Sequence, residues 1–386
     1  MKILIVLTYY RPHISGLTIY AERIAKAFAA RGHQVTVLTS HFDNCLARDE
    51  VVSGVRIIRA PVLFRLSKGV IMPTFGALAN RLVKAHDVLQ LHLPQFDAAG
   101  VAMRGRLLKK PTVITYHCDL ELPPGVFNRL ANSAVLLMND LAAKFTHRIV
   151  TYTQDYATHS GFTKKYLHKV RVIPPPVVMP PVSPEAIAEF SKRHNPKGQR
   201  PVIGMAARFA TEKGVEVLLR AIPRILDSYP DALFQFVGPH KNIIGEEQYY
   251  QRLKAEIEKY ESSGNWKFLG SMSPTEMSAF YSNLDLLVVP SLNSTEAFGL
   301  VQIEAMMHGV HCVTSNLPGV RQPVKVHGMG SIFQIGDSGE LASRILETLN
   351  NRNRKSGEES EFSMYSPDKI AEAYENLFEE IKTELC

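Results

Sequence analysis

The residues Ile3-Leu-Ile-Val-Leu-Thr8 form a short apolar run, and Val35-Thr-Val-Leu-Thr39 forms a second one. Between them, residues 18–31 carry apolar side chains at helical spacing, and Gly32 follows as a residue that ends helices. Runs rich in Val, Ile and Leu with little alternation are typical of strands that are buried on both faces. The stretch therefore predicts a β-α-β unit of a parallel sheet covered by helices.

The same alternation continues through the first half of the chain and stops at a proline-rich segment. Further strands are expected at Val88–His92, Thr112–Tyr116, Arg148–Tyr152 and Val170–Ile173. The prolines between Ile173 and Pro184 exclude both a helix and a central strand. We interpret this segment as the linker between two domains.

After the linker the pattern restarts. Strands are expected at Val202–Met205, Leu233–Val237, Trp266–Leu269, Asp285–Val289 and His311–Thr314. Helices are expected at about 214–228, 246–263, 274–283 and 299–308. Residues 367–385 predict a final amphipathic helix, whose apolar stripe consists of Ile370, Tyr374, Leu377, Phe378 and Ile381.

The expected fold is therefore α/β, with two Rossmann-like, doubly wound parallel-sheet domains that face each other across a cleft. The first domain comprises residues 1–174, the linker residues 175–184 and the second domain residues 185–362, and the C-terminal helix lies within residues 363–386. Ligands of such sheets bind outside the carboxyl ends of the strands. The turns after the strands are therefore where functional residues are expected.

The composition, with 45% hydrophobic and 21% charged residues among 386, is that of a globular protein. No apolar run approaches the ~18 residues that a membrane-spanning helix needs. The apolar start runs into Tyr9-Tyr-Arg-Pro12 rather than into a cleavage site of small residues. The four cysteines are scattered without C-x-x-C spacing, so we expect a cytoplasmic chain with reduced thiols and no zinc site.

The net charge of +7 is unevenly distributed along the chain. The first 180 residues hold 23 Lys and Arg against 10 Asp and Glu, whereas the remainder holds 21 against 27. Two interpretations stay open: chance combined with a solvated surface, or a first half that faces an anionic membrane surface or lipid carrier. Nucleic acid is not expected as a partner, because no zinc finger, Lys/Arg-rich run or other binding signature is present.

The segment Val62–Met72 mixes large apolar residues with Arg65 and Lys68. One interpretation is a loop packed on its own domain, and the other is an interfacial contact of a peripheral membrane protein. The basic surplus of the first half favours the second interpretation. Further basic residues that would extend such a surface are Arg104, Arg106, Lys109, Lys110, Lys164, Lys165, Lys169 and Arg171.

In the second half, Arg208 and Lys213 flank a turn between an expected strand and an expected helix. Two cations beside a helix start can hold a diphosphate by charge-assisted hydrogen bonds. They can also stabilise the negative charge of a departing diphosphate without a metal ion. For this pair by itself, the alternative is a surface Arg and Lys in a loop.

The sequence Glu296-Ala-Phe-Gly-Leu-Val-Gln-Ile-Glu304 holds two carboxylates, one on a loop and one on the helix that follows. Glu296 can reach a hydroxyl-bearing group, and the backbone N–H groups of Phe298, Gly299 and Leu300 can face an anion. Glu304, a turn further on, can accept hydrogen bonds from a diol such as a ribose. A nucleotide-sugar fits this layout because it carries a sugar, a diphosphate and a ribose.

In the first half, Gly16 precedes the first expected helix and would let the backbone approach an anion, unless it is a plain loop glycine. The turn is not G-x-G-x-x-G, which argues against a dinucleotide cofactor. His117 ends an expected strand, and its neutral imidazole can bond a sugar hydroxyl; the alternative is a buried histidine satisfied by a neighbour. Asp119 can contact an acceptor or cap the following segment. Candidates for an acceptor pocket are His13, His92, Asp97 and Asp119.

Together these motifs resemble the retaining, GT-B-fold glycosyltransferases of family 4, over nearly the whole chain. The resemblance rests on Gly204-x₃-Arg208-x₄-Lys213-Gly214, Phe236-Val-Gly238, Pro290-Ser291 and Glu296-x₇-Glu304, and more loosely on Leu91–Pro94, Thr115–His117 and Val170–Pro174. The chain departs from the family in three places: Ser15 stands where a second glycine is frequent, Pro175-Pro-Val-Val replaces Asn-Gly-Val-Asp, and no Glu follows Pro318-Gly-Val. These departures concern loop geometry and remove no charged motif residue.

The resemblance implies roles for these residues. It assigns the donor diphosphate and sugar to Gly16, Arg208, Lys213, Glu296, Phe298, Gly299 and Leu300, and the ribose and base to Glu304, Gly238, His240 and Phe268. The catalytic set would be His117, Glu296, Arg208 and Lys213, with His117 beside the transferring sugar. The resemblance also implies that the C-terminal helix returns to the first domain.

The activity implied is transfer of a sugar, with retention, from a UDP-sugar or alternatively a GDP-sugar to a saccharide or lipid-linked acceptor. No Asp-x-Asp occurs in the chain, so we expect neither a metal ion nor another cofactor. Two other functions stay open: a nucleotide-sugar epimerase or phosphorylase on the same plan, and a catalytically silent sugar-nucleotide binder. The first would need another acid/base set or a pyridoxal-binding lysine, and the retained charged motif residues argue against the second.

Overall fold

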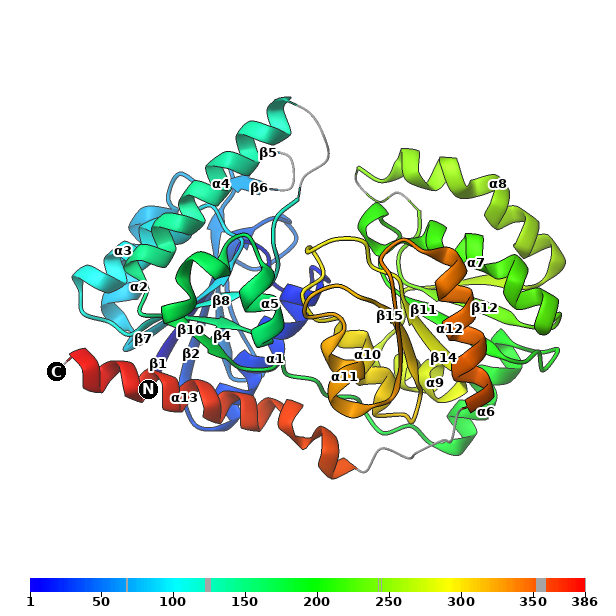
Figure 1. The fold of residues 1–386 in the computed structure, drawn as a ribbon. Helices are drawn as coiled ribbons and strands as arrows, with labels where there is room; N and C mark the ends of the chain where they lie inside the picture. The colour runs from blue at the N-terminus through cyan, green and yellow to red at the C-terminus, as the bar shows by residue number, and fades with distance from the viewer. Residues whose placement is uncertain (67–68, 122–125, 242, 244, 352–358, 386) are drawn as a thin grey trace. The chain divides into compact units, whose positions relative to one another are not determined.

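The computed structural model describes residues 1–386 except 67–68, 122–125, 242, 244, 352–358 and 386. The chain divides into two compact units (Figure 1). Unit 1 comprises Met1–Val177 together with Met364–Cys386, and unit 2 comprises Val178–Ser363. The boundary between residues 177 and 178 lies within the proline-rich segment.

Unit 1 is built on an eight-stranded sheet of order β10-β9-β8-β7-β1-β2-β4-β3. Every pair of neighbours in it is parallel except β3 with β4. A separate antiparallel hairpin joins β5 to β6. The strands are β1 (Lys2–Val6), β2 (Gln34–His41), β3 (Asp49–Val52), β4 (Val55–Pro61), β5 (Phe64–Leu66), β6 (Gly69–Ile71), β7 (Val88–Leu93), β8 (Thr112–Tyr116), β9 (Arg148–Thr151) and β10 (Val170–Val172).

The sheet of unit 1 is covered on both faces, with α1 and α13 on one side and α2, α3 and α4 on the other (Figure 1). Residues Ile3 to Val6 of the central strand β1 are fully buried, because helices exclude water from both faces. The helices are α1 (Gly16–Ala30), α2 (Phe75–Ala85), α3 (Ala98–Leu107), α4 (Val126–Phe145), α5 (Gln154–His159) and α13 (Pro367–Leu385), with a 3-10 turn at η1 (Thr163–Lys169). A further 3-10 turn, η3 (Glu359–Tyr365), begins in unit 2 and ends in unit 1.

The start and end of α1 follow from local sequence. The Ser15 hydroxyl accepts a hydrogen bond from the Thr18 N–H over 3.2 Å, and the Thr18 hydroxyl oxygen accepts one from the Ser15 N–H over 2.8 Å. This reciprocal capping satisfies N–H groups that the first helical turn leaves unpaired. After the helix, Gly32 has a φ of +85°, a left-handed conformation that glycine adopts without strain.

Unit 2 is built on a six-stranded parallel sheet of order β13-β12-β11-β14-β15-β16. Its strands are β11 (Val202–Ala206), β12 (Leu233–Val237), β13 (Trp266–Gly270), β14 (Leu286–Val289), β15 (Cys312–Ser315) and β16 (Gly330–Phe333). Its helices are α6 (Pro184–His194), α7 (Val215–Ser228), α8 (Glu247–Ser263), α9 (Pro274–Asn283), α10 (Leu300–Met306), α11 (Gln322–His327) and α12 (Ser338–Asn351), with a 3-10 turn η2 (Thr211–Lys213). Two doubly wound α/β units confirm the predicted fold class.

The expected strands and helices are all present, with bounds shifted by a few residues at most. The sequence patterns missed β3, β4, β5, β6 and β16. Strands β3 and β4 interrupt their apolar residues with charges such as Glu50, Arg56 and Arg59, which suits a sheet edge and lacks the continuous apolar run of central strands. The segment 62–72, expected as a loop, contains the β5–β6 hairpin, and its Lys68 lies outside the described residues.

The C-terminal helix α13 packs against α1 within unit 1. The predicted apolar stripe is confirmed, because Ile370, Tyr374, Leu377, Phe378 and Ile381 are all buried. Among the described residues, neither α13 nor any other helix combines the length and apolar character that crossing a bilayer requires.

Candidate functional site

The loops after β11 and β14 lie side by side at the carboxyl edge of the unit 2 sheet, because β11 pairs with β14. The Leu292 N–H donates to the Glu212 carbonyl over 2.9 Å. Gly214 has a φ of +69°, and a Cβ at this position would lie 2.1 Å from the Pro290 carbonyl oxygen. Glycine therefore lets the two loops touch, and their contact brings Lys213 to Glu296.

Lys213 and Glu296 form the central ion pair of this edge. The Lys213 Nζ donates to Glu296 Oε2 over 2.5 Å, and Glu296 Oε1 accepts a hydrogen bond from the Gly299 N–H over 3.0 Å. Burial lowers the pKa of Lys213, but the attraction and hydrogen bond of Glu296 outweigh it, so the pKa lies above its usual value. The lysine is therefore a fixed positive charge beside a carboxylate that is held through both oxygens.

Phe298, Gly299 and Leu300 lead from Glu296 into α10. Gly299 has a φ of +77°, and a Cβ there would lie 2.6 Å from Gln302 Nε2. That amide group donates to the carbonyls of Phe298 and Val320, over 3.1 Å and 2.8 Å. The turn is thus fixed by a buried glutamine and needs a glycine at its centre.

Arg208 lies at the same edge but pairs with Glu212, not with Glu296. Its side chain is 39% exposed. Burial raises the pKa of Glu212, but the charge of Arg208 and hydrogen bonds outweigh it and hold the pKa below its usual value. Arg208 and Lys213 therefore lie on one turn, each neutralised by its own carboxylate.

Glu304 lies one turn into α10, where its Oε2 accepts a hydrogen bond from the Tyr281 hydroxyl over 3.0 Å. Its backbone carbonyl accepts a hydrogen bond from His308 Nδ1 over 2.8 Å. The carboxylate is partly exposed. Glu304 is therefore held by α9 through Tyr281 and follows Glu296 along the same loop and helix.

The residues expected around a base gather at the ends of β12 and β13. Gly238 has a φ of +132°, and a Cβ there would lie 1.9 Å from the Ala207 carbonyl oxygen, so the turn again needs glycine. The His240 and Phe268 rings stack with centroids 4.1 Å apart and an interplanar angle of 9°. Burial lowers the pKa of His240, and the stacked ring is therefore neutral at pH 7.

In unit 1, His117 follows β8 and is almost completely buried. Its Nε2 lies 2.7 Å from His92 Nδ1, and its Nδ1 contacts the Tyr152 hydroxyl. Both ring nitrogens thus have protein partners, which is the alternative that the sequence left open. In this arrangement both nitrogens of the ring are occupied, and the expected place of His117 beside the transferring sugar stays a prediction.

The two histidines are neutral. Burial lowers the pKa of His92 to about 3, and burial together with the neighbouring His92 lowers the pKa of His117 well below its usual value. His92 Nε2 is buried without a partner among the described residues. An unpaired lone pair at His92 Nε2 costs less free energy than an unpaired N–H would, so we assign the proton of His92 to Nδ1, which donates to His117 Nε2. The proton of His117 then lies on Nδ1, which donates to the Tyr152 hydroxyl.

A network of buried hydroxyl groups adjoins this pair. The Tyr20 ring packs edge-on against His117, with centroids 5.0 Å apart, and its hydroxyl lies 2.7 Å from that of Tyr374 on α13. The Tyr374 hydroxyl is also 2.7 Å from Thr115 Oγ1, which accepts a hydrogen bond from Gln90. Sequence patterns missed these contacts. Tyr20 and Tyr374 occupy apolar positions of helices, and such positions predict that the side chains are buried but not which groups their hydroxyls contact.

The other acceptor candidates divide by exposure. His92 is fully buried, so it is corrected from a pocket residue to a partner of His117. The Asp119 carboxylate accepts hydrogen bonds from the Tyr116 and Ser160 hydroxyls over 2.9 Å and 2.6 Å, which holds the segment after β8. Asp97, at the start of α3, is partly exposed, and burial raises its pKa to about 6.

Gly16 and His13 lie on the turn after β1. Gly16 is the first residue of α1, and a Cβ there would meet nothing within 4 Å. Neither backbone strain nor a steric clash therefore requires a glycine at this position. The glycine instead leaves open space at the start of the helix. The exposed His13 ring stacks on Tyr9, with centroids 4.9 Å apart.

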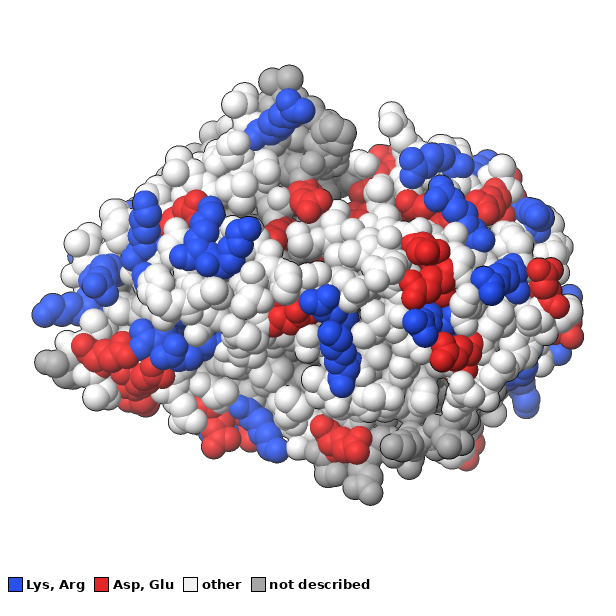
Figure 2. Space-filling model, in the orientation of Figure 1, with Lys and Arg blue, Asp and Glu red and all other residues white. Residues whose placement is uncertain are grey.

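On the face shown in Figure 2, the basic residues of unit 1 are separated by uncharged and acidic surface. Lys169 donates to the carbonyls of Ala143, Lys144 and Thr146, where α4 ends. Arg171 pairs with Glu380 over 2.8 Å. Both residues therefore make contacts that hold unit 1 together, and their expected place in a surface for anionic partners stays a prediction.

No group of three or more His, Cys, Asp or Glu that could hold a metal ion occurs among the described residues. The catalytic and donor-site candidates Arg208, Lys213 and Glu296 lie in unit 2, and His117 lies in unit 1. The chemistry available at the unit 2 edge is that of two cations and three carboxylates around glycine turns.

Two family models together match most of the chain: Glycosyltransferase Family 4 at residues 14–181 and Glycosyl transferases group 1 at residues 186–361. A 2-deoxystreptamine glucosyltransferase of Streptomyces kanamyceticus is 25% identical over 348 residues, covering 85% of this chain and 88% of the relative. A phosphatidyl-myo-inositol mannosyltransferase of Mycobacterium leprae is 24% identical over 346 residues, covering 87% and 84%.

Solved structures share the fold. Anabaena HepE in complex with UDP superposes with a TM-score of 0.76 at 19% identity, covering 98% of this chain and 100% of that one. A second HepE structure, in complex with UDP-glucose, gives 0.70 at 19% identity, covering 100% and 99%. With both halves matched by family models and with relatives that are named glycosyltransferases, the chain belongs to the group 1, family 4 glycosyltransferases and has their GT-B fold.

Proposed function

We propose that this glycosyltransferase moves a sugar from a nucleoside-diphosphate sugar to a hydroxyl of a saccharide or lipid-linked acceptor, with retention and without a metal ion. The observation that carries the proposal is the 2.5 Å pair of Lys213 and Glu296. It joins a cation suited to a diphosphate with a carboxylate suited to sugar hydroxyls. A UDP-sugar is the favoured donor, supported by the UDP and UDP-glucose complexes of HepE, and a GDP-sugar is the alternative.

In this proposal Arg208 and Lys213 bind the donor diphosphate. Both are paired with carboxylates, Glu212 and Glu296, so their positive charges are already held in position before the donor arrives. When the bond between the sugar and the diphosphate breaks, negative charge grows on the departing phosphate. Fixed cations beside that phosphate stabilise the charge without having to move. A metal ion would otherwise provide this stabilisation.

Glu296 orients the sugar in this proposal and is not a covalent nucleophile. Its two oxygens already accept from Lys213 and from the Gly299 N–H, so the carboxylate is held in one orientation. The bond from the anomeric carbon to the diphosphate oxygen breaks, and a bond to the acceptor oxygen forms on the same face. The acceptor proton passes to the departing diphosphate.

The rest of the donor is assigned along the same edge. The N–H groups of Phe298 and Leu300 face the sugar and phosphate, whereas the Gly299 N–H holds Glu296 in place. Glu304 accepts hydrogen bonds from the ribose. The base rests near Gly238, His240 and Phe268; the stacked pair of rings there supports this choice, because an aromatic surface suits a planar base.

Unit 1 supplies the acceptor side. His117 shapes the end of β8 through its bonds to His92 and Tyr152. Gly16, in contrast, belongs to the donor and leaves room for its diphosphate before α1. A peripheral contact with an anionic membrane belongs to the same proposal. It is supported by the exposed Leu63 and Phe64 beside Arg65, and by the exposed Leu107, Leu130 and Leu137 of the neighbouring helices.

A thermal-shift screen followed by a transfer assay tests the proposal. UDP or GDP and the matching sugar nucleotide should raise the melting temperature, because ligands that bind only the native state stabilise it. A radiolabelled sugar should then appear in an acceptor product. Formation of an epimerised donor would contradict the proposed reaction. So would a donor that binds but undergoes neither transfer to an acceptor nor slow hydrolysis.

A further inference from the structure

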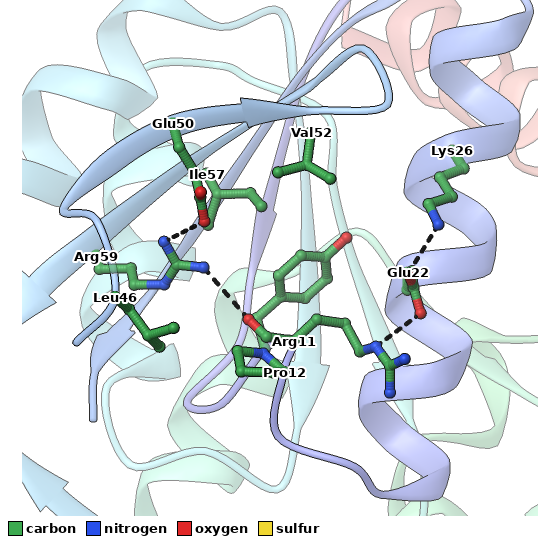
Figure 3. Close-up of a pocket in the computed structure, with 10 residues that line it drawn as sticks. Arg11, Pro12, Glu22, Lys26, Leu46, Glu50, Val52, Ile57 and Arg59 are labelled. Carbon is green, nitrogen blue, oxygen red and sulfur yellow. Dashed lines mark hydrogen bonds and ion pairs between the residues drawn. The ribbon is translucent and has the colours of Figure 1, made fainter. Parts of the chain in front are cut away.

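A pocket of about 230 Å³ opens in unit 1, between α1 and the strands β3 and β4, of which β3 forms the edge of the sheet. Figure 3 shows its two charged walls, with Glu22 and Lys26 on α1 and with Glu50 and Arg59 on the strands, while Arg11 reaches across from the turn after β1. Apolar side chains, Val52 and Ile57 among them, line the space between. The pocket holds three cations and two carboxylates.

The carboxylates of this pocket are already used. Glu22 accepts from Arg11 Nε over 3.0 Å and from Lys26 Nζ over 2.8 Å. Glu50 accepts from Arg59 Nη1 over 2.6 Å. One positive charge is therefore left without a carboxylate, and in the part of the chain that the structure describes the terminal guanidinium nitrogens of Arg11 have no protein acceptor.

Arg59 is built into the wall. Only 3% of the residue is exposed, its Nη1 donates to the Ala47 carbonyl over 2.6 Å, and its Nη2 donates to the Arg11 carbonyl over 3.3 Å. Its Nε is buried without a hydrogen-bond partner among the described residues. That N–H is shielded from the pocket as well as from solvent, so Arg59 serves the pocket through its other contacts, which hold Glu50 and the Arg11 turn in place.

The position of the pocket connects it with the proposed reaction. The Arg11 turn follows β1, and Arg59 lies near the end of β4, so both occupy the carboxyl edge of the sheet where ligands bind. His117 lies at the same edge, after β8. From β8 to β4 the sheet order gives four strand spacings, or about 20 Å.

We propose that this pocket binds the anionic end of the acceptor, a phosphate or carboxylate carried on a small body with an apolar face. Arg11 and Lys26 receive the anion, and the body lies against the apolar lining. The volume is below the roughly 300 Å³ at which whole-ligand pockets begin, so the pocket takes one terminal group and not a complete acceptor. The inference rests on the proposed transfer reaction, but the binding is testable without it.

Calorimetry on the full chain tests the inference with four probes: glucose 6-phosphate, glucuronate, glucose and inorganic phosphate. A charged sugar should bind more tightly than either glucose or inorganic phosphate. Arg11→Gln and Lys26→Gln should each weaken that binding about tenfold, since each removes a charge-assisted contact. Lys192→Gln, on exposed α6 of unit 2, is the control and should bind like the wild type.

The preference between the two charged sugars identifies the anion as a phosphate or a carboxylate. The inference would be overturned if glucose bound as tightly as both charged sugars, or if inorganic phosphate bound as tightly as its ester. It would also be overturned if Arg11→Gln, with an unchanged melting temperature, bound the charged sugars as tightly as the wild type. Nucleotide binding in unit 2 is measured separately with UDP. If the charged sugars bind but UDP does not, the proposed UDP-sugar donor is contradicted and the proposed anion pocket is supported.

Discussion

In unit 1 the side chains at the carboxyl ends of β7 and β8 are buried and neutral, whereas in unit 2 those after β11 and β14 are charged and partly exposed. His92 and His117 hold each other by an imidazole pair 2.7 Å long, inside a shell of tyrosines. Lys213 and Glu296 hold each other by an ion pair 2.5 Å long at the surface. Both clusters lie at the ligand-binding edge of a similar sheet.

The difference indicates two ways of preparing a site. A buried network fixes geometry, because every rotation of a ring would break hydrogen bonds away from water. A paired cation and carboxylate fix charge, because each partner keeps the other ionised and in place. We therefore expect the unit 2 cluster to govern donor affinity and chemistry together, and the unit 1 cluster to govern rate through position.

The largest effect should come from Lys213→Ala. It removes a cation from the donor diphosphate and leaves Glu296 without its partner, so kcat/KM should fall roughly 10²–10³-fold and nucleoside-diphosphate affinity should weaken as well. Calorimetry and initial rates measure the two effects. Lys325→Ala, on exposed α11, is the matched control. Unchanged nucleotide affinity in Lys213→Ala would count against the role of this residue.

His117→Ala should separate rate from affinity. Loss of the imidazole frees the end of β8 to move, and a displacement of about 1 Å can cost on the order of 10²-fold in rate. Nucleotide affinity should stay unchanged, since the donor cluster lies in unit 2. Initial rates beside UDP calorimetry measure both quantities. Full activity in the variant would make His117 a structural residue only.

Acid should destabilise unit 1 through the histidine pair. The pKa of His92 is about 3 in the folded chain against about 6.5 unfolded, so its stabilisation is complete above pH 6.5 and is lost as the pH falls toward 3. At pH 5 this loss is about 2 kcal/mol. Lys213 has a raised pKa, so its contribution is full below pH 10.5 and lost only above it.

Melting temperatures at pH 7.5 and pH 5 test this difference between the clusters. The wild type should lose stability at pH 5, and His92→Phe should lose less, because it has one proton fewer to take up on unfolding. An equal drop in both proteins would mean that the pair does not carry the acid sensitivity.

A smaller effect is expected from Tyr374→Phe. The change removes one hydroxyl between Tyr20 and Thr115, so the free energy of unfolding should fall by about 1–2 kcal/mol, with a modest loss of kcat and unchanged KM for the donor. The control Tyr260→Phe, on α8, makes the same substitution at a buried tyrosine whose hydroxyl makes no hydrogen bond to any residue that the structure describes. If Tyr374→Phe were as active as this control, the hydroxyl contact of α13 would have no effect on the end of β8 that carries His117.

The smallest effect should be that of a chelator. If Arg208 and Lys213 stabilise the departing diphosphate, activity in excess EDTA should equal activity in added Mg²⁺. Complete loss that Mg²⁺ restores would show that the cations of unit 2 need a metal ion beside them.

The core of this account could be predicted from sequence because its signals are local. Buried parallel strands are apolar runs, and motif residues such as Arg208, Lys213 and Glu296 stand on the turns after them. The continuous apolar runs that mark central strands are absent from β3 and β4, and so the pocket that these two strands line was missed with them.

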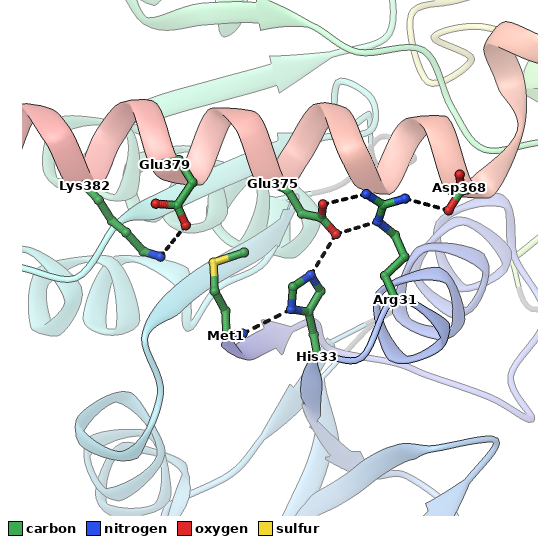
Figure 4. Close-up of polar contacts among 7 residues, drawn as sticks. All are labelled: Met1, Arg31, His33, Asp368, Glu375, Glu379 and Lys382. Carbon is green, nitrogen blue, oxygen red and sulfur yellow. Dashed lines mark hydrogen bonds and ion pairs between the residues drawn. The ribbon is translucent and has the colours of Figure 1, made fainter.

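Contacts between distant segments could not be predicted, because no local pattern records them. Figure 4 shows Glu375 of α13 bound by Arg31 and His33, and Asp368 bound by the same arginine. The Arg31 hydrogen bonds hold the pKa of Glu375 below its usual value. The pairing of His117 with His92 is of the same kind: two strand-end histidines were visible in the sequence, but not that they satisfy each other.

Hydrogen–deuterium exchange of the full chain with and without UDP tests the donor cluster most directly. The account predicts slower exchange in the segments 207–214 and 290–304, which carry the two cations and their three neighbouring carboxylates, and a smaller change or none in these segments for Lys213→Ala. Slower exchange confined to other parts of the chain, with both segments unaffected by bound UDP, would contradict it.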